Sequence, residues 1–562
     1  MKTSFFRLPL ALTAVALIAA GCDRSSDETA AFEDDSGILQ FVPADSAYAF
    51  VRLEPMPEAF DERLAEVNAA AMAYNDAMMK QVAEAMSDDE TAVAVQQMMR
   101  MVQDLSTPGG MQRMGIDPDA QLAFYDVDMV PVLRAGLDDA AAFGEMISEV
   151  EEAFDFEAET GEINGVSYKY IDVEGARLIW LISDSALAVT VSHAEATDES
   201  LAAQLGLVAP AENIADTGEL ATIASDFGYT EQGIGFVDTL RVVDGLLDPD
   251  GLIETLTSSQ QDQLSDVCRA EIRQAVANVP RMTAGVTRAD ETGVEGSMVI
   301  VLREELAGDL QGLAAAVPGL GTVSSALISG GFSFDASVAR KFVENRLAEM
   351  SASPFECEFL AGGNAGVTEA QEFLTRQPLP PTLYDFRGMY FSVDGIDIEQ
   401  LIQEQTPESA EVNMILAMKN PESLTAMGAL LVPGFAELGL AQDGETREVP
   451  GGMMNPTGLP LWTAMTGDRI GVTLGQGAED RLSGLMAMKA NSDAPLMGLD
   501  VNAGAYFALI SDMMPVVEQE EVDAVESLVD LMDALGRVYD RLDMTVDIHE
   551  KGVVFTSGVT FK

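Results

Sequence analysis

The sequence predicts an α+β protein of two diverged lobes, each an antiparallel sheet with helices packed on one face. Apolar residues recur at helical spacing between residues 60 and 105, but they alternate with a period of two between residues 121 and 192. This order of a strand, long helices and then a meander differs from the regular strand–helix alternation of a doubly wound sheet. Similar segments also occur twice in the same order, which favours an ancient internal duplication.

The elements of the first lobe follow from this periodicity. A strand is expected at 48–51, and amphipathic helices are expected at 60–86 and 95–105, before Pro108-Gly109-Gly110 ends them. The next expected elements are strands at 121–134, 167–173, 177–182 and 186–192, a helix at 137–152, and a turn at Ile163-Asn164-Gly165. A helix at 261–279 should then lead into a hairpin that turns at 290–293.

Three kinds of landmark support the duplication. Trp180 and Trp462, the only tryptophans, lie in similar apolar segments. Hairpins starting at Met282 and Met544 each follow a candidate helix, at 261–279 and 522–539. A short aromatic segment, expected to open a strand each time, occurs at 47–50, 233–236, 388–391 and 504–507. The separations between matching landmarks differ, so the sequence predicts diverged lobes rather than a regular solenoid.

The boundary between the lobes is predicted near residue 376, before the proline-rich segment 378–381. A strand at 330–335 and a helix at 336–350 are assigned to the first lobe. The predicted organisation is therefore a first α+β lobe with a helical insertion at 38–376 and a second, related α+β lobe at 377–562.

The composition excludes some classes of function. The chain of 562 residues has a formal charge of −62, with 31 basic and 93 acidic residues. A general nucleic-acid binder needs lysine and arginine to displace counterions from phosphates, so no nucleic-acid partner is expected. The charge also disfavours adhesion to anionic lipid headgroups. Because the acids are dispersed, we interpret them as a surface adapted to salty surroundings; recruitment of cations is the alternative.

No motif for catalysis, a cofactor or a metal is found. The two histidines, His193 and His549, are far apart, and there is no zinc-binding or nucleophile-elbow motif. The segment 319–324 matches a dinucleotide fingerprint only in part, and Asp-Pro segments at 117–119 and 248–251 fail the pattern of a calcium loop. We therefore predict that the protein is not an enzyme and has no cofactor or metal.

Methionine is abundant, with 30 residues in the chain. Nine fall in one helical stretch: Met72, Met78, Met79, Met86, Met98, Met99, Met101, Met111 and Met114. Their helical spacing favours core packing. An adaptable apolar groove and a copper(I) site are the alternatives.

The first 22 residues have the pattern of a secretory signal. Lys2 and Arg7 precede an apolar run at 8–20, and small residues stand before Cys22. This pattern resembles the lipobox of bacterial lipoproteins, which implies removal of residues 1–21, lipidation of Cys22 and an acidic tether at 22–37. The alternatives are an ordinary signal peptide or an uncleaved anchor with a chance cysteine. The 13-residue run is shorter than the ~20 residues that a spanning helix needs.

If Cys22 carries the lipid, Cys268 and Cys357 remain as an even pair in an oxidising compartment. We predict a disulfide between them; two unrelated buried thiols are the alternative. A catalytic cysteine is not favoured, because neither histidine lies near a cysteine in the sequence.

From the lipobox through the acidic tether to Pro43-Ala44-Asp45, the chain resembles large Gram-negative envelope lipoproteins that have no assigned activity. The resemblance implies an acyl-chain anchor with the body in the periplasm and leaves the inner or outer membrane open. The expected function is non-enzymatic, either binding an envelope protein or scaffolding an assembly. The alternative is a carrier that holds an apolar ligand or lipid between sheet and helices.

Overall fold

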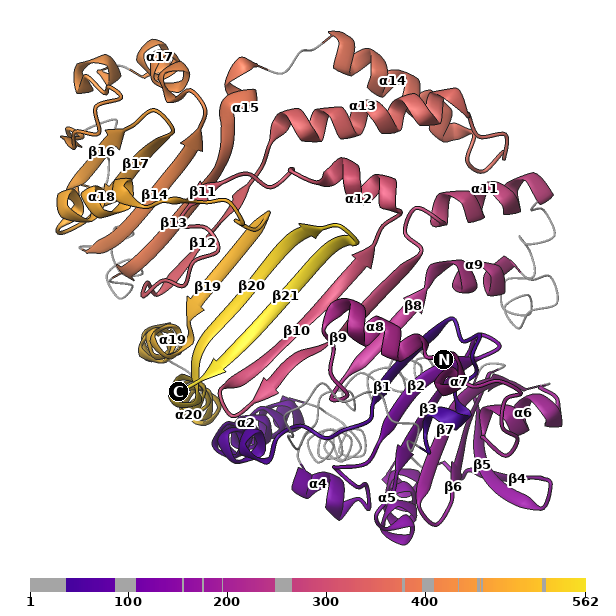
Figure 1. The fold of residues 1–562 in the computed structure, drawn as a ribbon. Coiled ribbons are helices and arrows are strands. Elements are labelled where there is room, and N and C mark those ends of the chain that lie inside the picture. The colour runs from indigo at the N-terminus through magenta and orange to yellow at the C-terminus, as the bar shows by residue number, and fades with distance from the viewer. Residues whose placement is uncertain are drawn as a thin grey trace. The chain divides into compact units, whose positions relative to one another are not determined.

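The computed structural model describes residues 37–85, 108–153, 156–173, 176–194, 196–247, 265–376, 380–396, 409–432, 434–451, 455, 458–517 and 522–562. It is a mixed α/β structure with antiparallel strand pairing. The chain divides into two compact units (Figure 1). Unit 1 is Met1–Leu264, Ile272–Met298 and Val522–Ala534; unit 2 is Ser265–Glu271, Val299–Glu521 and Leu535–Lys562.

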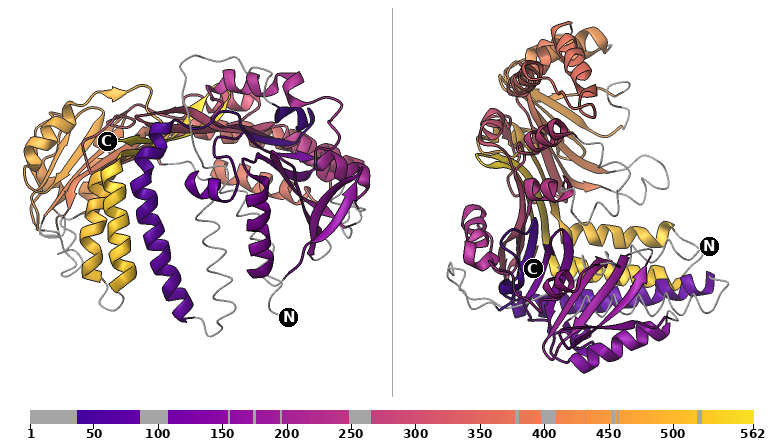
Figure 2. Two further views of the ribbon diagram at one scale, coloured as in Figure 1. Left: turned by 90° about the horizontal axis from the view of Figure 1, so that it is seen from below. Right: turned by 90° about the vertical axis from the view of Figure 1, so that its right-hand side faces the viewer.

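Unit 1 is built on one antiparallel sheet with helices between its strands. Its strands are β1 Tyr48–Arg52, β2 Leu122–Val127, β3 Val130–Gly136, β4 Glu159–Ile163, β5 Val166–Val173, β6 Ala176–Ile182, β7 Ala186–His193, β8 Ile234–Asp238 and β9 Arg281–Asp290. Its helices include α2 Glu58–Ala85, α4 Pro108–Arg113, α5 Ala140–Ala153, α6 Asp198–Gln204, α7 Ile214–Thr217, α8 Glu219–Phe227 and α9 Thr239–Leu247. Both views of Figure 2 show α2, in indigo, extending away from this sheet.

The strand order in unit 1 is β4-β5-β6-β7-β3-β2-β1-β8-β9, with every neighbouring pair antiparallel. Local sequence sets the tight turns. Asn164-Gly165 joins β4 to β5 with positive φ angles of 56° and 83°, as the predicted turn requires. Asp128 and Met129 join β2 to β3 with φ angles of 53° and 67°.

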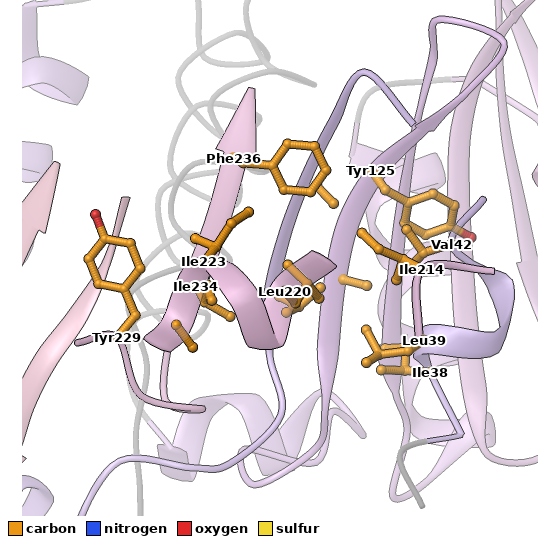
Figure 3. Packing of buried hydrophobic residues seen from close by; sticks show 14 of the residues in the cluster. Ile38, Leu39, Val42, Tyr125, Ile214, Leu220, Ile223, Tyr229, Ile234 and Phe236 are labelled. Atoms are coloured by element: carbon orange, nitrogen blue, oxygen red, sulfur yellow. The ribbon is translucent and has the colours of Figure 1, made fainter. Parts of the chain in front are cut away.

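The two faces of this sheet are both covered by helices. On one face, Leu220 and Ile223 of α8 pack with Tyr125 and Phe236 of the sheet (Figure 3). Successive residues of a strand point to opposite faces. Accordingly, Ile179 lies in a cluster with residues of α6, whereas Trp180 lies in a cluster with Phe143 of α5. The prediction that helices cover one face only is therefore wrong for unit 1.

Unit 2 is likewise built on an antiparallel sheet. Its strands are β11 Val317–Pro318, β12 Ile328–Ser333, β13 Phe386–Ile396, β14 Ala410–Met418, β15 Arg447–Glu448, β16 Leu461–Met465, β17 Arg469–Leu474, β18 Ala490–Asn491, β19 Met497–Asn502, β20 Tyr539–His549 and β21 Gly552–Phe561. Its helices include α12 Glu304–Leu310, α13 Ala336–Ala352, α14 Gly362–Arg376, α15 Pro381–Asp385, α17 Pro421–Leu431, α18 Ala478–Ala487 and α19 Ala503–Val517. The division between the units runs within α11 Asp266–Val276, β10 Gly293–Val301 and α20 Val522–Val538.

The main sheet of unit 2 has the order β15-β16-β17-β14-β13-β12-β19-β20-β21. In both units the first main strand, β1 or β12, lies inside the sheet, with a paired strand on each side. A hairpin flanks it on one side, β2–β3 or β13–β14. The strand that comes late in the chain, β8 or β19, flanks it on the other side.

Several predicted elements differ from the structure. The boundary predicted near residue 376 falls inside unit 2, so β12 and α13, which the sequence places in the first lobe, belong to unit 2. The segment 504–507 lies in α19 rather than opening a strand. It is apolar and aromatic, a composition that both a short strand and a helix can have. The helix expected at 95–105 lies outside the described residues.

The two tryptophans occupy strands with corresponding places in the two orders, β6 and β16. Their packing differs, because Trp180 is in a cluster with α5, whereas Trp462 packs beside a cluster containing Leu482 of α18. Trp180 is buried and Trp462 is half-buried. The buried indole Nε1 of Trp180 has no hydrogen-bond acceptor in the described parts of the chain.

Candidate functional site

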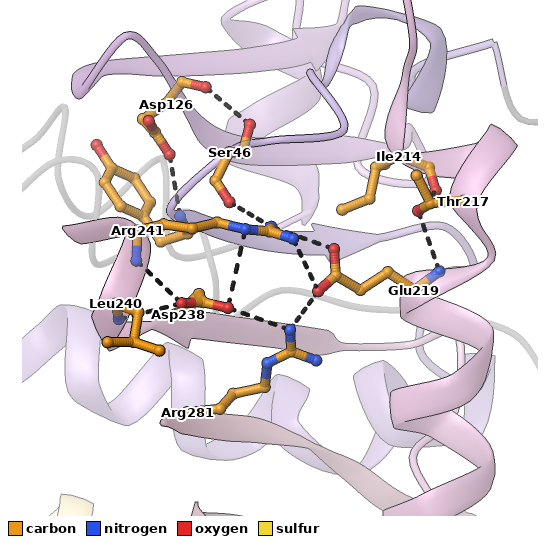
Figure 4. A network of polar contacts seen from close by, with 10 residues as sticks. Ser46, Asp126, Ile214, Thr217, Glu219, Asp238, Leu240, Arg241 and Arg281 are labelled. Carbon is orange, nitrogen blue, oxygen red and sulfur yellow. Dashed lines mark hydrogen bonds and ion pairs between the residues drawn. The ribbon is translucent and has the colours of Figure 1, made fainter. Parts of the chain in front are cut away.

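A polar cluster in unit 1 joins two arginines to two acids (Figure 4). Arg241 donates from Nη1 to the backbone oxygen of Ser46 at 2.9 Å and to Oε2 of Glu219 at 3.2 Å. Arg281 pairs with Oε1 of Glu219 and donates to Oδ2 of Asp238 at 3.3 Å. Because the cluster contains two positive and two negative side chains, these charges balance one another.

The local structure fixes these side chains in place. Glu219 is the first residue of α8, Asp238 ends β8, and Arg281 begins β9. Oδ1 of Asp238 accepts from the backbone N–H groups of Leu240 and Arg241 at 3.1 and 3.0 Å, which caps the start of α9. The cluster therefore ties two helices to neighbouring strands of the sheet.

Asp126 lies beside this cluster and is only 4% exposed. Its Oδ1 accepts from the N–H of Tyr48 at 2.9 Å and its Oδ2 from the N–H of Met129 at 3.1 Å. Burial raises the pKa of Asp126, and the backbone hydrogen bonds lower that pKa by less. The pKa of the Tyr48 hydroxyl is also raised, first by burial and then by the charge of Asp126.

A cavity of about 190 Å³ lies next to Asp126. It is lined by Pro43, Asp45, Ser46, Asp126, Val127, Asp128, Met129, Arg241 and Gly245. Pockets for drug-sized ligands usually measure ~300–1,000 Å³, so this one is small. Its lining includes no histidine or cysteine, and no group of metal-ligating residues occurs in the parts of the chain that the structure describes. The polar cluster therefore acts as a structural tie.

Asp126→Asn should lower the free energy of unfolding by about 1–3 kcal/mol, because an amide offers one acceptor oxygen to two backbone donors. The difference in unfolding free energy between the wild type and the variant should grow on acidification. The raised pKa means that the folded wild type gains stability from Asp126 as the pH falls through that pKa, and the variant lacks this gain. Urea unfolding at neutral pH and at about pH 4 measures both effects.

Asp128→Asn is the matched control, because Asp128 is exposed in the same turn. It should leave the stability nearly unchanged. A deficit for Asp126→Asn that shrank on acidification would contradict the role given to the buried carboxylate.

An extended apolar surface crosses strands β13, β12, β19 and β20 of unit 2. Directly paired residues on neighbouring strands point to the same face, as do residues two apart along a strand. The register gives three rows: Met389, Phe332, Met497 and Val546; Phe391, Gly330, Leu499 and Met544; Val393, Ile328, Val501 and Leu542. We call these twelve positions the apolar face. None of them has a charged or hydrogen-bonding side chain.

The apolar face is exposed at four neighbouring positions on β12, β19 and β20, whereas Val501 and Val546 are each 9% exposed. Phe332 is 40%, Met497 43%, Leu499 37% and Met544 42% exposed. Gly330 lies among these larger residues, and a Cβ built there would be 3.3 Å from Cδ1 of Leu499. Contiguous exposed apolar surfaces of this kind mark interaction sites on soluble proteins.

On β12 and β19 the opposite face of the same sheet is polar or small, yet it is the covered one. Ser329, Ser333 and Ser392 are buried there. Tyr390 and Ile415 on this face pack in a cluster with Leu482 of α18. A half-buried antiparallel sheet ordinarily packs its apolar side on the core and leaves its polar side in water. Unit 2 reverses that arrangement at β12 and β19.

The structure places the predicted site residues as follows. Cys22 lies outside the described residues. Cys268 and Cys357 are disulfide-bonded, with Cα atoms 4.6 Å apart, in agreement with the predicted pair. Both backbone N–H groups at 356 and 357 donate to the carboxylate of Glu271.

The methionine stretch is only partly described. Met111 and Met114 are buried, as core packing predicts, whereas Met78 is exposed. Residues 86–107 are outside the described chain, so the groove and the copper site remain hypotheses. Sequence reasoning missed Met389, Met497 and Met544, which belong to the apolar face. The sequence signal on β19 was the alternation of Met497, Leu499 and Val501 with the smaller or polar residues Gly498 and Asp500.

Among the residues that the structure describes, no helix combines the length and apolar character needed to cross a membrane. Comparison of the chain with protein-family models, with curated proteins and with solved structures found no match.

Proposed function

We propose that the protein is a lipid-anchored, non-enzymatic binding protein of the bacterial envelope, with its body in the periplasm. The apolar face of unit 2 is the observation that carries the proposal, because it offers a large surface for association. The balanced charges of the polar cluster and the small cavity in unit 1 give no support to catalysis. The N-terminal pattern that ends at Cys22 supports the anchor.

The second candidate function is that of a carrier for an apolar ligand. The exposure of Phe332, Met497, Leu499 and Met544 favours it, since an apolar ligand would shield these side chains from water. The sequence predicts a ligand held between sheet and helices. The open surface suggests instead that the ligand lies on the sheet itself.

The two units are proposed to descend from an internal duplication. The supporting observation is the shared strand order, in which β1, β2, β3, β6, β7 and β8 correspond to β12, β13, β14, β16, β17 and β19. The segments before β1 and β12 also match, because Leu39 and Leu320 are both buried in the cores of their units.

Cys22→Ser tests the anchor. It should abolish labelling of the protein with a radioactive or clickable fatty acid and leave the unprocessed precursor, because the thiol that accepts the lipid is gone. Cys268→Ser with Cys357→Ser is the control and should retain the label. Normal labelling of the Cys22→Ser protein would remove the anchor from the proposal.

A further inference from the structure

We infer that the apolar face of unit 2 binds the acyl chains of a phospholipid whose headgroup has no net negative charge. The inference deepens the proposed function and rests on it, because it names the ligand of the proposed binding surface. It depends on the side chains of the face, on the pairing of its strands and on the charge of the chain.

The strand pairing excludes recognition of a peptide as an added strand. β12 pairs with β13 and β19, β13 also pairs with β14, and β20 pairs with β19 and β21. Every strand of the face therefore has its backbone groups satisfied on both sides. Strand addition requires a free edge, so only side chains are available to a ligand here.

The side chains of the face provide no polar recognition. The three rows consist of Phe, Met, Leu, Val and Ile around Gly330. Protein interfaces ordinarily combine apolar anchors with hydrogen bonds at about one per 100–200 Å². A ligand that needs no hydrogen bonds, such as an acyl chain, fits this surface better than a folded protein does.

The dimensions and flexibility of the face suit an extended apolar chain. Strands lie ~4.8 Å apart and alternate residues ~7 Å apart, so four strands and three rows cover about 14 Å in each direction. Met389 and Met497 lie diagonally across from Gly330 on the two neighbouring strands, and Met544 lies one strand further along its row, beyond Leu499. Methionine side chains are flexible and adjust to irregular apolar shapes, as the many conformations of an acyl chain require.

The charge of the protein selects the headgroup and disfavours a second copy. The formal charge of −62 repels another molecule of the same chain as well as an anionic headgroup. A zwitterionic headgroup avoids this repulsion. The surface is therefore better suited to single zwitterionic lipids than to self-association.

The test uses residues 22–562 with Cys22→Ser, exported behind a signal sequence that is cleaved without lipidation, so that a covalent lipid cannot contribute to the mass. The protein is incubated with phosphatidylcholine vesicles, separated from them and analysed by native mass spectrometry. We expect bound lipid on the protein whose apolar face is unchanged. The amount of bound lipid should fall at least tenfold after Leu499→Asp and stay unchanged after Leu430→Asp. Leu430 is 86% exposed on α17, so it provides the same substitution away from the face.

A milder double variant distinguishes loss of lipid binding from misfolding. Met497→Gln with Met544→Gln keeps the side-chain lengths and should also lose lipid at least tenfold, while near-ultraviolet circular dichroism stays native. Equal lipid loading of the wild type and the folded face variants would overturn the site. A face-dependent dimer without lipid would overturn the ligand class in favour of a second copy.

Vesicles of phosphatidylglycerol provide the headgroup test. We expect lower loading than from phosphatidylcholine at low salt, and equal loading would overturn the assignment of the headgroup. Failure of lipid binding leaves the result for fatty-acid labelling at Cys22 unaffected. The ligand and the anchor can therefore fail separately.

Discussion

Removing the Cys268–Cys357 disulfide should lower the free energy of unfolding of unit 2 by about 4–5 kcal/mol in the chain-entropy model. The bond closes a loop of sequence separation 89, and both cysteines belong to unit 2. Without the bond, the unfolded chain gains conformational freedom that folding must remove. Urea unfolding of Cys268→Ala with Cys357→Ala, compared with the wild type, measures this loss.

Glu271→Gln is a useful control for this prediction. Its carboxylate accepts from the N–H groups of Glu356 and Cys357 at 2.8 and 3.0 Å, so the variant weakens the same contact and retains the bond. Its loss should be far smaller than that of the double cysteine variant. Identical unfolding of wild-type protein with and without reductant would contradict the disulfide prediction.

Trp180→Ala should cost about 3–5 kcal/mol, because it empties a space within a packed cluster. Trp180 is 6% exposed and packs among residues that include Phe143, Leu187 and Ile147. Trp462→Ala should cost less, since that residue is half-buried. Denaturant unfolding of the two alanine variants gives the comparison.

Trp180→Phe is the matched control. It keeps a large ring in the cluster and removes an indole N–H that has no acceptor there, so most of the stability should return. In single-tryptophan proteins, Trp180 should emit at shorter wavelength and resist acrylamide more than Trp462. Equal costs for the two alanine variants would contradict the difference in packing.

Much of the fold could be predicted because local signals were strong. A continuous apolar run marks β6, alternation with a period of two marks β7, and Asn164-Gly165 supplies the positive φ angles of a two-residue turn. Helical spacing likewise predicts α5 and α13 close to their observed bounds. The error at 504–507 has the opposite cause, because four residues are too short to show a period.

The candidate sites were harder to predict because they depend on distant pairing. Ser46, Glu219 and Arg281 meet only because β1 and β9 flank β8 in the sheet. The apolar face has a different difficulty. Alternation in β19 shows that one side is apolar, but it does not show which side the helices cover. For unit 2, the usual assumption that the apolar side is covered gives the wrong answer at β12 and β19.

The position of β1 between β2 and β8 has a consequence for the order in which unit 1 can fold. Synthesis proceeds from the N-terminus, so β1 is made first, but its register partners are Phe124 on β2 and Val237 on β8. One edge of β1 therefore stays unpaired until about 70 further residues have been made, and the other edge until about 180 have been made. Such distant pairing slows folding. Until residue 237 has been made, β1 is an edge strand of the nascent sheet, and its unpaired edge is open to other chains.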